Sequence, residues 1–128
     1  MKKIMFAILM MASSMANADW VSYGETDLGK YFVDPDRVAQ SGTNLTTWIK
    51  VNLYAPKANS AGNMYRSSMQ SYLIDCRGQR QALRALVYYA GNDGQGAVLN
   101  TYDYTTELKW NLIVPNSIGE ALTNMLCR

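Results

Sequence analysis

Residues 64–89, MYRSSMQSYLIDCRGQRQALRALVYY, organise the rest of this chain. The stretch predicts two long strands that meet at a tight turn around Arg77 and Gly78, with apolar residues at every second position of the second strand. Cys76 lies where the first strand is expected to end. The only other cysteine, Cys127, is the penultimate residue. A bond between them would tie the end of the chain to the middle of the sheet.

Residues 1–18 have the pattern of a secretory signal peptide. Lys2 and Lys3 precede an almost wholly apolar run over residues 4–12, and small residues at Ala16 and Ala18 predict cleavage after Ala18. The alternative is a membrane anchor, but a spanning helix needs about 20 apolar residues and this run is about half as long. No cysteine lies near the expected cut. We therefore expect a mature form without a lipid anchor and without a membrane span.

The remaining residues, 19–128, are of a length that predicts one domain with a modest core. The net charge of +2 belongs to the whole chain, whose 12 basic residues include Lys2 and Lys3. Without those two lysines, ten basic residues stand against ten acidic ones. Nucleic-acid-binding domains normally have a clear basic excess, so no nucleic-acid partner is expected.

Two cysteines in an exported chain favour one disulfide, between Cys76 and Cys127. The bond would close a loop of about 50 residues, which the chain-entropy account values at roughly 4 kcal/mol. That is a large share of the roughly 5–15 kcal/mol that stabilises a typical domain. The alternative, two free thiols, is disfavoured in an oxidising compartment.

Runs of β-forming residues, such as 45–54 and 97–104, are joined mostly by short turns, and short connections favour antiparallel pairing. After Pro115, the residues Ser117 and Glu120 form the capping box of a helix start. The sequence therefore predicts an α+β fold. We expect an antiparallel sheet of five to six strands with one C-terminal helix tied by the disulfide.

Residues 55–63 have no periodicity and predict a mobile loop. Residues 91–96, GNDGQG, could cradle a phosphate, but a phosphate loop is followed by a helix with Lys and Ser or Thr. Here a strand-like run follows instead, so a plain hairpin turn is the favoured interpretation.

The residue inventory gives little support to catalysis. The chain has no histidine, which removes Ser-His and Cys-His nucleophiles and the usual zinc ligand sets. Asp34 and Asp36 form a close acidic pair, but Pro35 between them favours a turn. We therefore predict a protein that is not an enzyme, with no catalytic residues, no metal site and no cofactor.

Aromatic and arginine side chains are the better candidates for binding. The chain has nine tyrosines and three tryptophans, residue types frequent at interfaces and equally able to fill the faces of a small sheet. Arg77, Arg80 and Arg84 cluster around the expected hairpin turn, and Arg80 and Arg84 are expected on one face. These three arginines are the predicted binding residues, and a solvated outer face is the alternative interpretation.

The order of several short motifs resembles the surface-adhesin protein E family of exported bacterial domains. The resemblance covers nearly all of residues 19–128 and is most specific near the C-terminus. The matching elements are Trp20, Tyr31-Phe-Val-Asp34 with Val38, Thr47-Trp48, Asp75-Cys76 with Arg80, a glycine turn before a strand, Trp110 with Pro115, Ser117, Glu120 and Leu122, and Cys127.

The resemblance implies an antiparallel sheet with a C-terminal helix, and a protein-binding function. The type member of that family is a surface lipoprotein that binds host matrix and plasma proteins, so the implied partner is a protein of that kind. Because this sequence has no lipidation cysteine, we expect it in the periplasm of a Gram-negative cell, with the cell surface or secretion as alternatives. A second interpretation is a periplasmic inhibitor or immunity-type protein against an envelope-targeted enzyme. A third is a structural accessory of the envelope.

Overall fold

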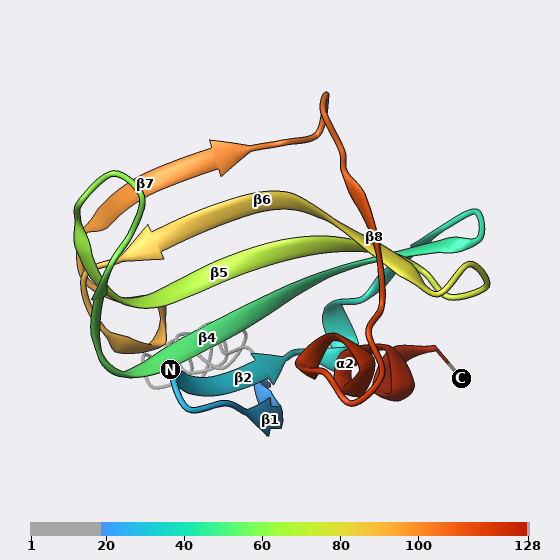
Figure 1. Cartoon of the computed structure of the whole chain (residues 1–128), viewed down its shortest axis with the longest axis horizontal. Helices are drawn as coiled ribbons and strands as arrows, with labels where there is room; N and C mark the ends of the chain where they lie inside the picture. The colour runs from blue at the N-terminus through green and yellow to red at the C-terminus, as the bar shows by residue number, and fades with distance from the viewer. Residues whose placement is uncertain (1–18, 128) are drawn as a thin grey trace, which may run out of the picture.

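The computed structural model describes residues 19–127 as one curved antiparallel sheet with a short C-terminal helix (Figure 1). The predicted signal peptide lies outside the described residues. Two short 3-10 turns, η3 and η4, interrupt the connections. The elements in chain order are β1 (Val21–Glu25), β2 (Gly29–Val33), η3 (Pro35–Arg37), β3 (Ala39–Ser41), β4 (Asn44–Ala58), β5 (Met64–Asp75), β6 (Arg80–Tyr89), η4 (Asn92–Gly94), β7 (Val98–Asp103), β8 (Trp110–Leu112) and α2 (Ile118–Leu126).

Every strand pair is antiparallel, in the order β1-β2-β4-β5-β6-β7, with β3 added to β4 and β8 added to β6. The antiparallel sheet with one C-terminal helix is confirmed. The predicted number of five to six strands was wrong, because the sheet has eight. The count was too low in part because β3 has three residues, too few to display an alternating pattern.

The predicted hairpin is the centre of this sheet. β5 and β6 pair from Ser67 opposite Tyr89 down to Asp75 opposite Arg80. The turn is closed by the side chain of Asp75, whose Oδ1 accepts a hydrogen bond of 2.9 Å from the backbone N of Gly78. One register shift lies between Ser71 and Tyr72 of β5.

Residues 55–63 differ from the predicted mobile loop. β4 continues to Ala58, which pairs with Met64, so only the tip of the connection lies outside the sheet. The tip is organised by Asn59, whose Oδ1 accepts backbone hydrogen bonds of 3.0 Å from Ala61 and from Asn63. Asparagine side chains that bond to nearby backbone amides stabilise such turns, and the composition of the loop concealed this one.

The hydrophobic core lies between one face of the sheet and α2. Val33, Ile49 and Val51 share that face through the pairing of β2 with β4, and Leu122 of α2 packs against them. The predicted helix start is confirmed, because the Oγ of Ser117 accepts a 3.2 Å hydrogen bond from the backbone N of Glu120. The cap fixes the first turn of a helix of nine residues.

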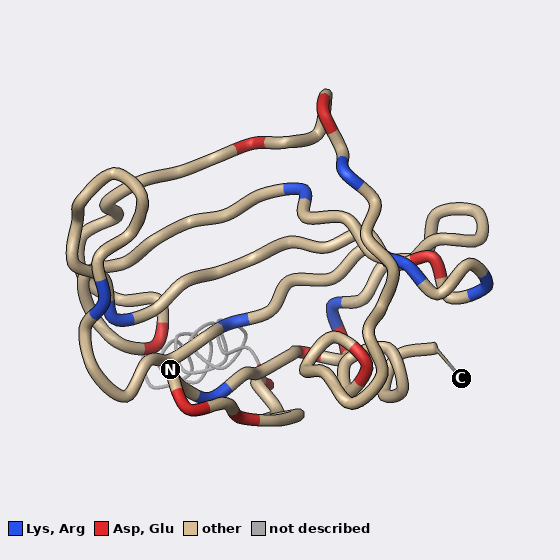
Figure 2. Tube along the Cα trace, viewed as in Figure 1, with Lys and Arg blue, Asp and Glu red and all other residues tan. Residues whose placement is uncertain are grey.

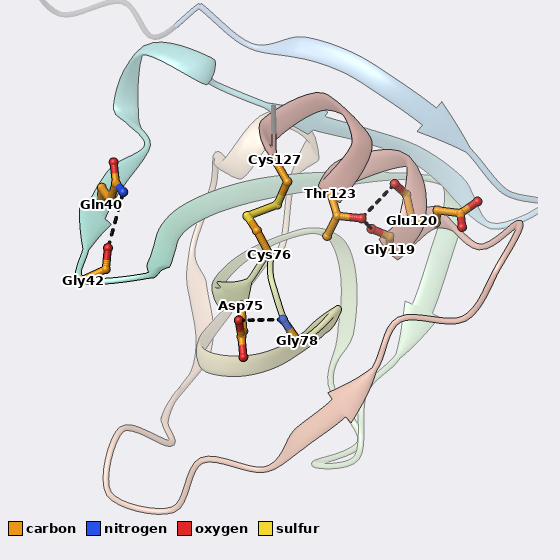
Figure 3. Close-up of a disulfide and its surroundings, with 9 residues drawn as sticks. All are labelled: Gln40, Gly42, Asp75, Cys76, Gly78, Gly119, Glu120, Thr123 and Cys127. Carbon is orange, nitrogen blue, oxygen red and sulfur yellow. Dashed lines mark hydrogen bonds between the residues drawn. A yellow bond between two sulfur atoms is a disulfide. The ribbon is translucent and has the colours of Figure 1, made fainter.

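The predicted disulfide is present. Cys76 follows β5 directly and bonds to Cys127, which ends α2, with 5.6 Å between their Cα atoms (Figure 3). The two residues are 51 positions apart in the sequence. The bond therefore holds the C-terminal helix against the end of the central hairpin.

Replacing Cys76 and Cys127 together by Ala should lower the free energy of unfolding by about 4 kcal/mol, because the unfolded chain loses a long covalent loop. Urea denaturation of the oxidised parent protein and of the double variant measures the difference. A reducing agent should destabilise the parent and leave the variant unchanged. Equal midpoints for parent and variant would contradict the assigned role of the bond.

Candidate binding surfaces

The register of the sheet places the three tryptophans on the face opposite the core. Trp48 alternates with the core residues of β4, so its side chain points away from the core. Trp110 of β8 pairs with Ala82, which is paired through Leu73 to Thr46 of β4. Because Thr46 and Trp48 are two residues apart, Trp110 lies on the same face as Trp48. Trp20 joins them, since its ring lies 5.0 Å from the Nζ of Lys50 on that same face. We call this surface the tryptophan face.

A groove of about 270 Å³ lies on the tryptophan face. Trp48, which is 42% exposed, is the most accessible aromatic side chain in it. Its other walls are apolar or aromatic, and an ion pair of 3.2 Å between Asp34 and Arg37 lies at its rim. The lining residues are Trp20, Asp34, Arg37, Trp48, Met69, Val87 and Tyr89.

Asp34 and Asp36 belong to a turn, which is the interpretation that Pro35 favours in the sequence. Asp34 caps η3, with its Oδ1 accepting a 3.1 Å hydrogen bond from the backbone N of Asp36. Within residues 19–127, no three His, Cys, Asp or Glu side chains come together as a metal site would need.

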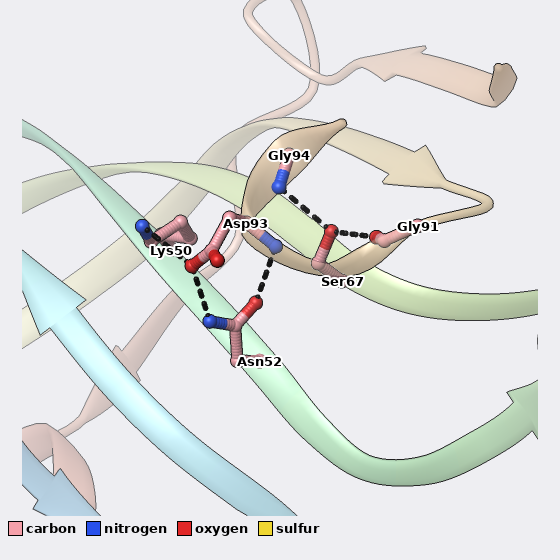
Figure 4. Close-up of polar contacts among 6 residues, drawn as sticks. All are labelled: Lys50, Asn52, Ser67, Gly91, Asp93 and Gly94. Carbon is pink, nitrogen blue, oxygen red and sulfur yellow. Dashed lines mark hydrogen bonds and ion pairs between the residues drawn. The ribbon is translucent and has the colours of Figure 1, made fainter. Parts of the chain in front are cut away.

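Lys50 is the buried centre of the tryptophan face, with 6% of its surface exposed. Its Nζ lies 3.1 Å from the Oδ1 of Asp93 (Figure 4) and 5.0 Å from the ring centres of both Trp20 and Phe32. Asn52 forms two hydrogen bonds with Asp93. Its Nδ2 donates to the Oδ1 of Asp93 at 2.6 Å, and its Oδ1 accepts from the backbone N of Asp93 at 2.7 Å. Hydrogen bonds from Asn52 and from Lys50 lower the pKa of Asp93.

The predicted hairpin turn at residues 91–96 does connect β6 to β7, and it also folds back onto β4 and β5. The Oγ of Ser67 donates to the carbonyl of Gly91 at 2.5 Å and accepts from the backbone N of Gly94 at 2.9 Å (Figure 4). Asp93 has a positive φ of 60°, which turns it toward Lys50. The connection therefore supplies the counter-charge for a lysine 43 residues earlier.

Replacing Asp93 by Asn should destabilise the protein by roughly 2 kcal/mol at pH 7, because Lys50 then lies buried without its counter-charge. The native pKa of Asp93 is lowered, so its contribution is present above the unfolded value of about 3.9 and is lost as pH falls through the native value. The difference between parent and variant should therefore shrink below about pH 4.

Urea titrations between neutral and acidic pH measure this effect, with the exposed Asp27→Asn variant as control. The control should match the parent protein at every pH. A difference for Asp93→Asn that stays constant on acidification would show that the charge of Asp93 is not its cause.

The three predicted arginines have different surroundings. Arg77 lies exposed in the hairpin turn. Arg80 pairs with Asp75 at 3.0 Å, and its guanidinium lies 4.6 Å from the ring centre of Trp110. Arg84 is the unpaired residue of the bulge in β6, where its carbonyl accepts a 2.7 Å hydrogen bond from the backbone N of Tyr104.

Arg80 is thus stacked against Trp110, a contact that no local sequence pattern predicts. Hydrogen bonds from the backbone of Gly78 and from Arg80 lower the pKa of Asp75, so this ion pair helps to order the turn. Figure 2 shows basic and acidic segments distributed over the whole trace.

The opposite face of the sheet, which we call the tyrosine face, has two parts. Near α2, burial raises the pKa values of Tyr23 and Tyr72, which belong to the edge of the core. Farther from α2, a series of half-buried rings forms edge and stacking contacts, with centroid distances of 4.5, 6.3 and 6.2 Å. These rings belong to Tyr65, Tyr88, Tyr102 and Tyr104, which we call the tyrosine ladder.

From the sequence alone, each tyrosine could either fill the core or form an interface, and no tyrosine was assigned to one of these roles. The signal that could have separated them is the Tyr102-x-Tyr104 alternation, which puts two rings on one side of a strand near the edge of the sheet. Trp48 lies on the face opposite the apolar positions of its strand, as simple alternation along β4 requires.

The family model for surface-adhesin protein E matches residues 20–128. This chain belongs to the surface-adhesin protein E family. No curated protein sequence matches it. The family supports a role like that of a surface adhesin.

Solved structures of a protein from Haemophilus influenzae share the fold of this surface-adhesin protein E family member. Crystal form II of protein E matches with a TM-score of 0.62 and 14% identity, over 76% of this chain and 79% of that chain. Protein E from non-typeable Haemophilus influenzae matches with a TM-score of 0.63 and 13% identity, over 88% and 77%. At this identity the likeness concerns the fold alone. Among the described residues, no helix has the length and apolar character needed to cross a bilayer.

Proposed function

We propose that this protein is an exported, non-enzymatic binding protein that holds a protein partner on its tryptophan face. The observation that carries the proposal is the groove beside the exposed ring of Trp48, on a chain of an adhesin family. Tryptophan, tyrosine and arginine are the residues that most often dominate the binding energy of protein interfaces. The partner class that the family suggests is a host matrix or plasma protein.

The groove suits one large apolar side chain of a partner. Met69 and Val87 form an apolar floor, and the ring of Trp48 can close over whatever lies on it. Because Lys50 is already neutralised by Asp93, the centre of this face offers no unpaired charge that a partner would have to desolvate.

Arg77, Arg80 and Arg84 are proposed as further polar contacts, located toward the β5–β6 turn. Arg77 is exposed and can hold a carboxylate with two hydrogen bonds. Arg80 is oriented in advance by Asp75 and Trp110, so less side-chain entropy is lost when it binds. The near balance of charge outside residues 1–18 favours short-range contacts over long-range attraction.

Replacing Trp48 by Ala should weaken binding to the partner by at least about 2 kcal/mol, roughly 30-fold in Kd, since an interface tryptophan is a typical anchor. The measurement is surface plasmon resonance against a panel of purified host matrix and plasma proteins, after export and cell-surface display have been tested by fractionation. Leu28→Ala, which truncates another exposed apolar side chain, is the matched control.

The control should bind as the parent protein does. A Trp48→Ala variant that remains folded by circular dichroism and binds with unchanged affinity would remove the groove from the proposal. Binding only to an envelope enzyme, with inhibition of that enzyme, would favour the inhibitor interpretation instead.

Replacing Arg77, Arg80 and Arg84 together by Gln should weaken the same interaction roughly tenfold or more, because charge-assisted hydrogen bonds to the partner are lost. Single Gln variants at each position apportion the effect, and thermal unfolding of the Arg80 variant reports the cost of losing its pair with Asp75. Unchanged affinity of the folded triple variant would exclude these arginines as contacts.

A further inference from the structure

The tyrosine ladder is a second surface with a different chemistry from the tryptophan face. Its four rings follow one another from β5 across β6 to β7 and beyond, and the last two, of Tyr102 and Tyr104, are within 7° of parallel. All four are half-buried, so each offers part of its ring to solvent. The protein thus presents a row of aromatic rings with phenol hydroxyls at their tips.

Three asparagines lie beside this row. Asn100 of β7 is directly opposite Tyr88, and its Oδ1 accepts hydrogen bonds from the Nδ2 atoms of Asn59, at 2.8 Å, and Asn63, at 2.9 Å. Within residues 19–127 no side chain or backbone group accepts a hydrogen bond from the Nδ2 of Asn100. The cluster therefore holds Asn100 in one orientation while its own amide donor remains available next to the ladder.

Among the described residues, the two rows that cross the middle of this face contain no charged side chain. Ser68 and Tyr88 lie in the row that contains Asn100, and Gln70 and Leu86 lie in the row that contains Tyr102. Lys57 is opposite Tyr65 at one end of this face, and Glu107 and Lys109 line a hollow beside Tyr104 at the other. An uncharged ligand with many hydrogen-bonding groups matches the middle of the face.

We propose that the tyrosine ladder and the asparagine cluster bind an uncharged oligosaccharide chain containing N-acetylhexosamine units, carried by an extracellular glycoprotein. The C–H faces of sugar rings pack on aromatic rings, whose faces carry partial negative charge. Side-chain amides can donate to and accept from sugar hydroxyls and acetamido groups. Sulfated or sialylated chains would bring negative charges to a surface whose centre has no cation to meet them.

A polypeptide is the less suitable occupant of this surface. The centres of protein interfaces are enriched in Trp, Met and Arg as well as Tyr. On this protein the tryptophans and the groove with Met69 lie on the other face, and the ladder has Asn100 beside it instead. The inference rests on the proposed function only in assigning the glycan to an extracellular glycoprotein.

The decisive variant is Asn100→Asp. A carboxylate at this position can still accept the hydrogen bonds of Asn59 and Asn63, so the fold should persist, but it replaces the available amide donor with a negatively charged acceptor. Chitotetraose is the probe, titrated into the ¹⁵N-labelled protein and followed by NMR. The parent protein should bind it, and Asn100→Asp should bind at least tenfold more weakly.

Tyr102→Ala should weaken chitotetraose binding to a similar extent, because it removes a stacking ring. Trp48→Ala, on the other face, should bind chitotetraose as the parent does. Cellotetraose, which lacks acetamido groups, should bind more weakly, and a sulfated heparin-derived tetrasaccharide should not compete. Thermal unfolding of each variant establishes that it is folded.

Absence of chitotetraose binding to the parent protein, or equal binding by a folded Asn100→Asp variant, would overturn the inference. Preferential binding of the sulfated chain would overturn the inference too. If the protein instead sediments with purified cell-wall sacculi in preference to binding a glycoprotein, the assignment of the glycan to an extracellular glycoprotein is wrong. Failure of the proposed function has a different signature: Trp48→Ala would then bind the protein partner normally, whatever the outcome with free oligosaccharide.

Discussion

The disulfide between Cys76 and Cys127 decides how much of the sheet is covered, because it fixes where α2 can lie. The nine residues of α2 span about 14 Å, whereas the twelve residues of β5 span about 40 Å. A helix tied to the end of β5 therefore covers the core at one end only. Large side chains must shield the rest of that face, and the tyrosine ladder does so.

The other face is organised around a buried charge. Lys50 would be costly to bury alone, but Asp93 neutralises it and the rings of Trp20 and Phe32 enclose it. The same contacts position Trp20, one wall of the groove beside Trp48. A single sheet thus presents two surfaces of different chemistry, one with tryptophan and arginine, the other with tyrosine and uncharged amides.

Local signals predicted the parts of the fold that depend on neighbouring residues. The capping box at Ser117 and the disulfide of Cys76 were readable because their chemistry is carried by a few residue types. The contact of Asp93 with Lys50 was not readable, since 43 residues separate them and they meet only because the β6–β7 connection folds back onto β4. The bulge at Arg84 likewise has no signature in the sequence pattern. Only the pairing of β5 with β6 shows that the surroundings of Arg84 differ from those of Arg77 and Arg80.

The central claim is that the two faces are separate binding surfaces, and one ¹⁵N NMR titration tests it most directly. The indole N–H signal of Trp48 reports on one face and the side-chain amide signals of Asn59, Asn63 and Asn100 report on the other. Chitotetraose should shift the asparagine signals and leave Trp48 unchanged, whereas a deglycosylated protein partner should do the reverse. Shifts of the same set of signals by both ligands would contradict the account.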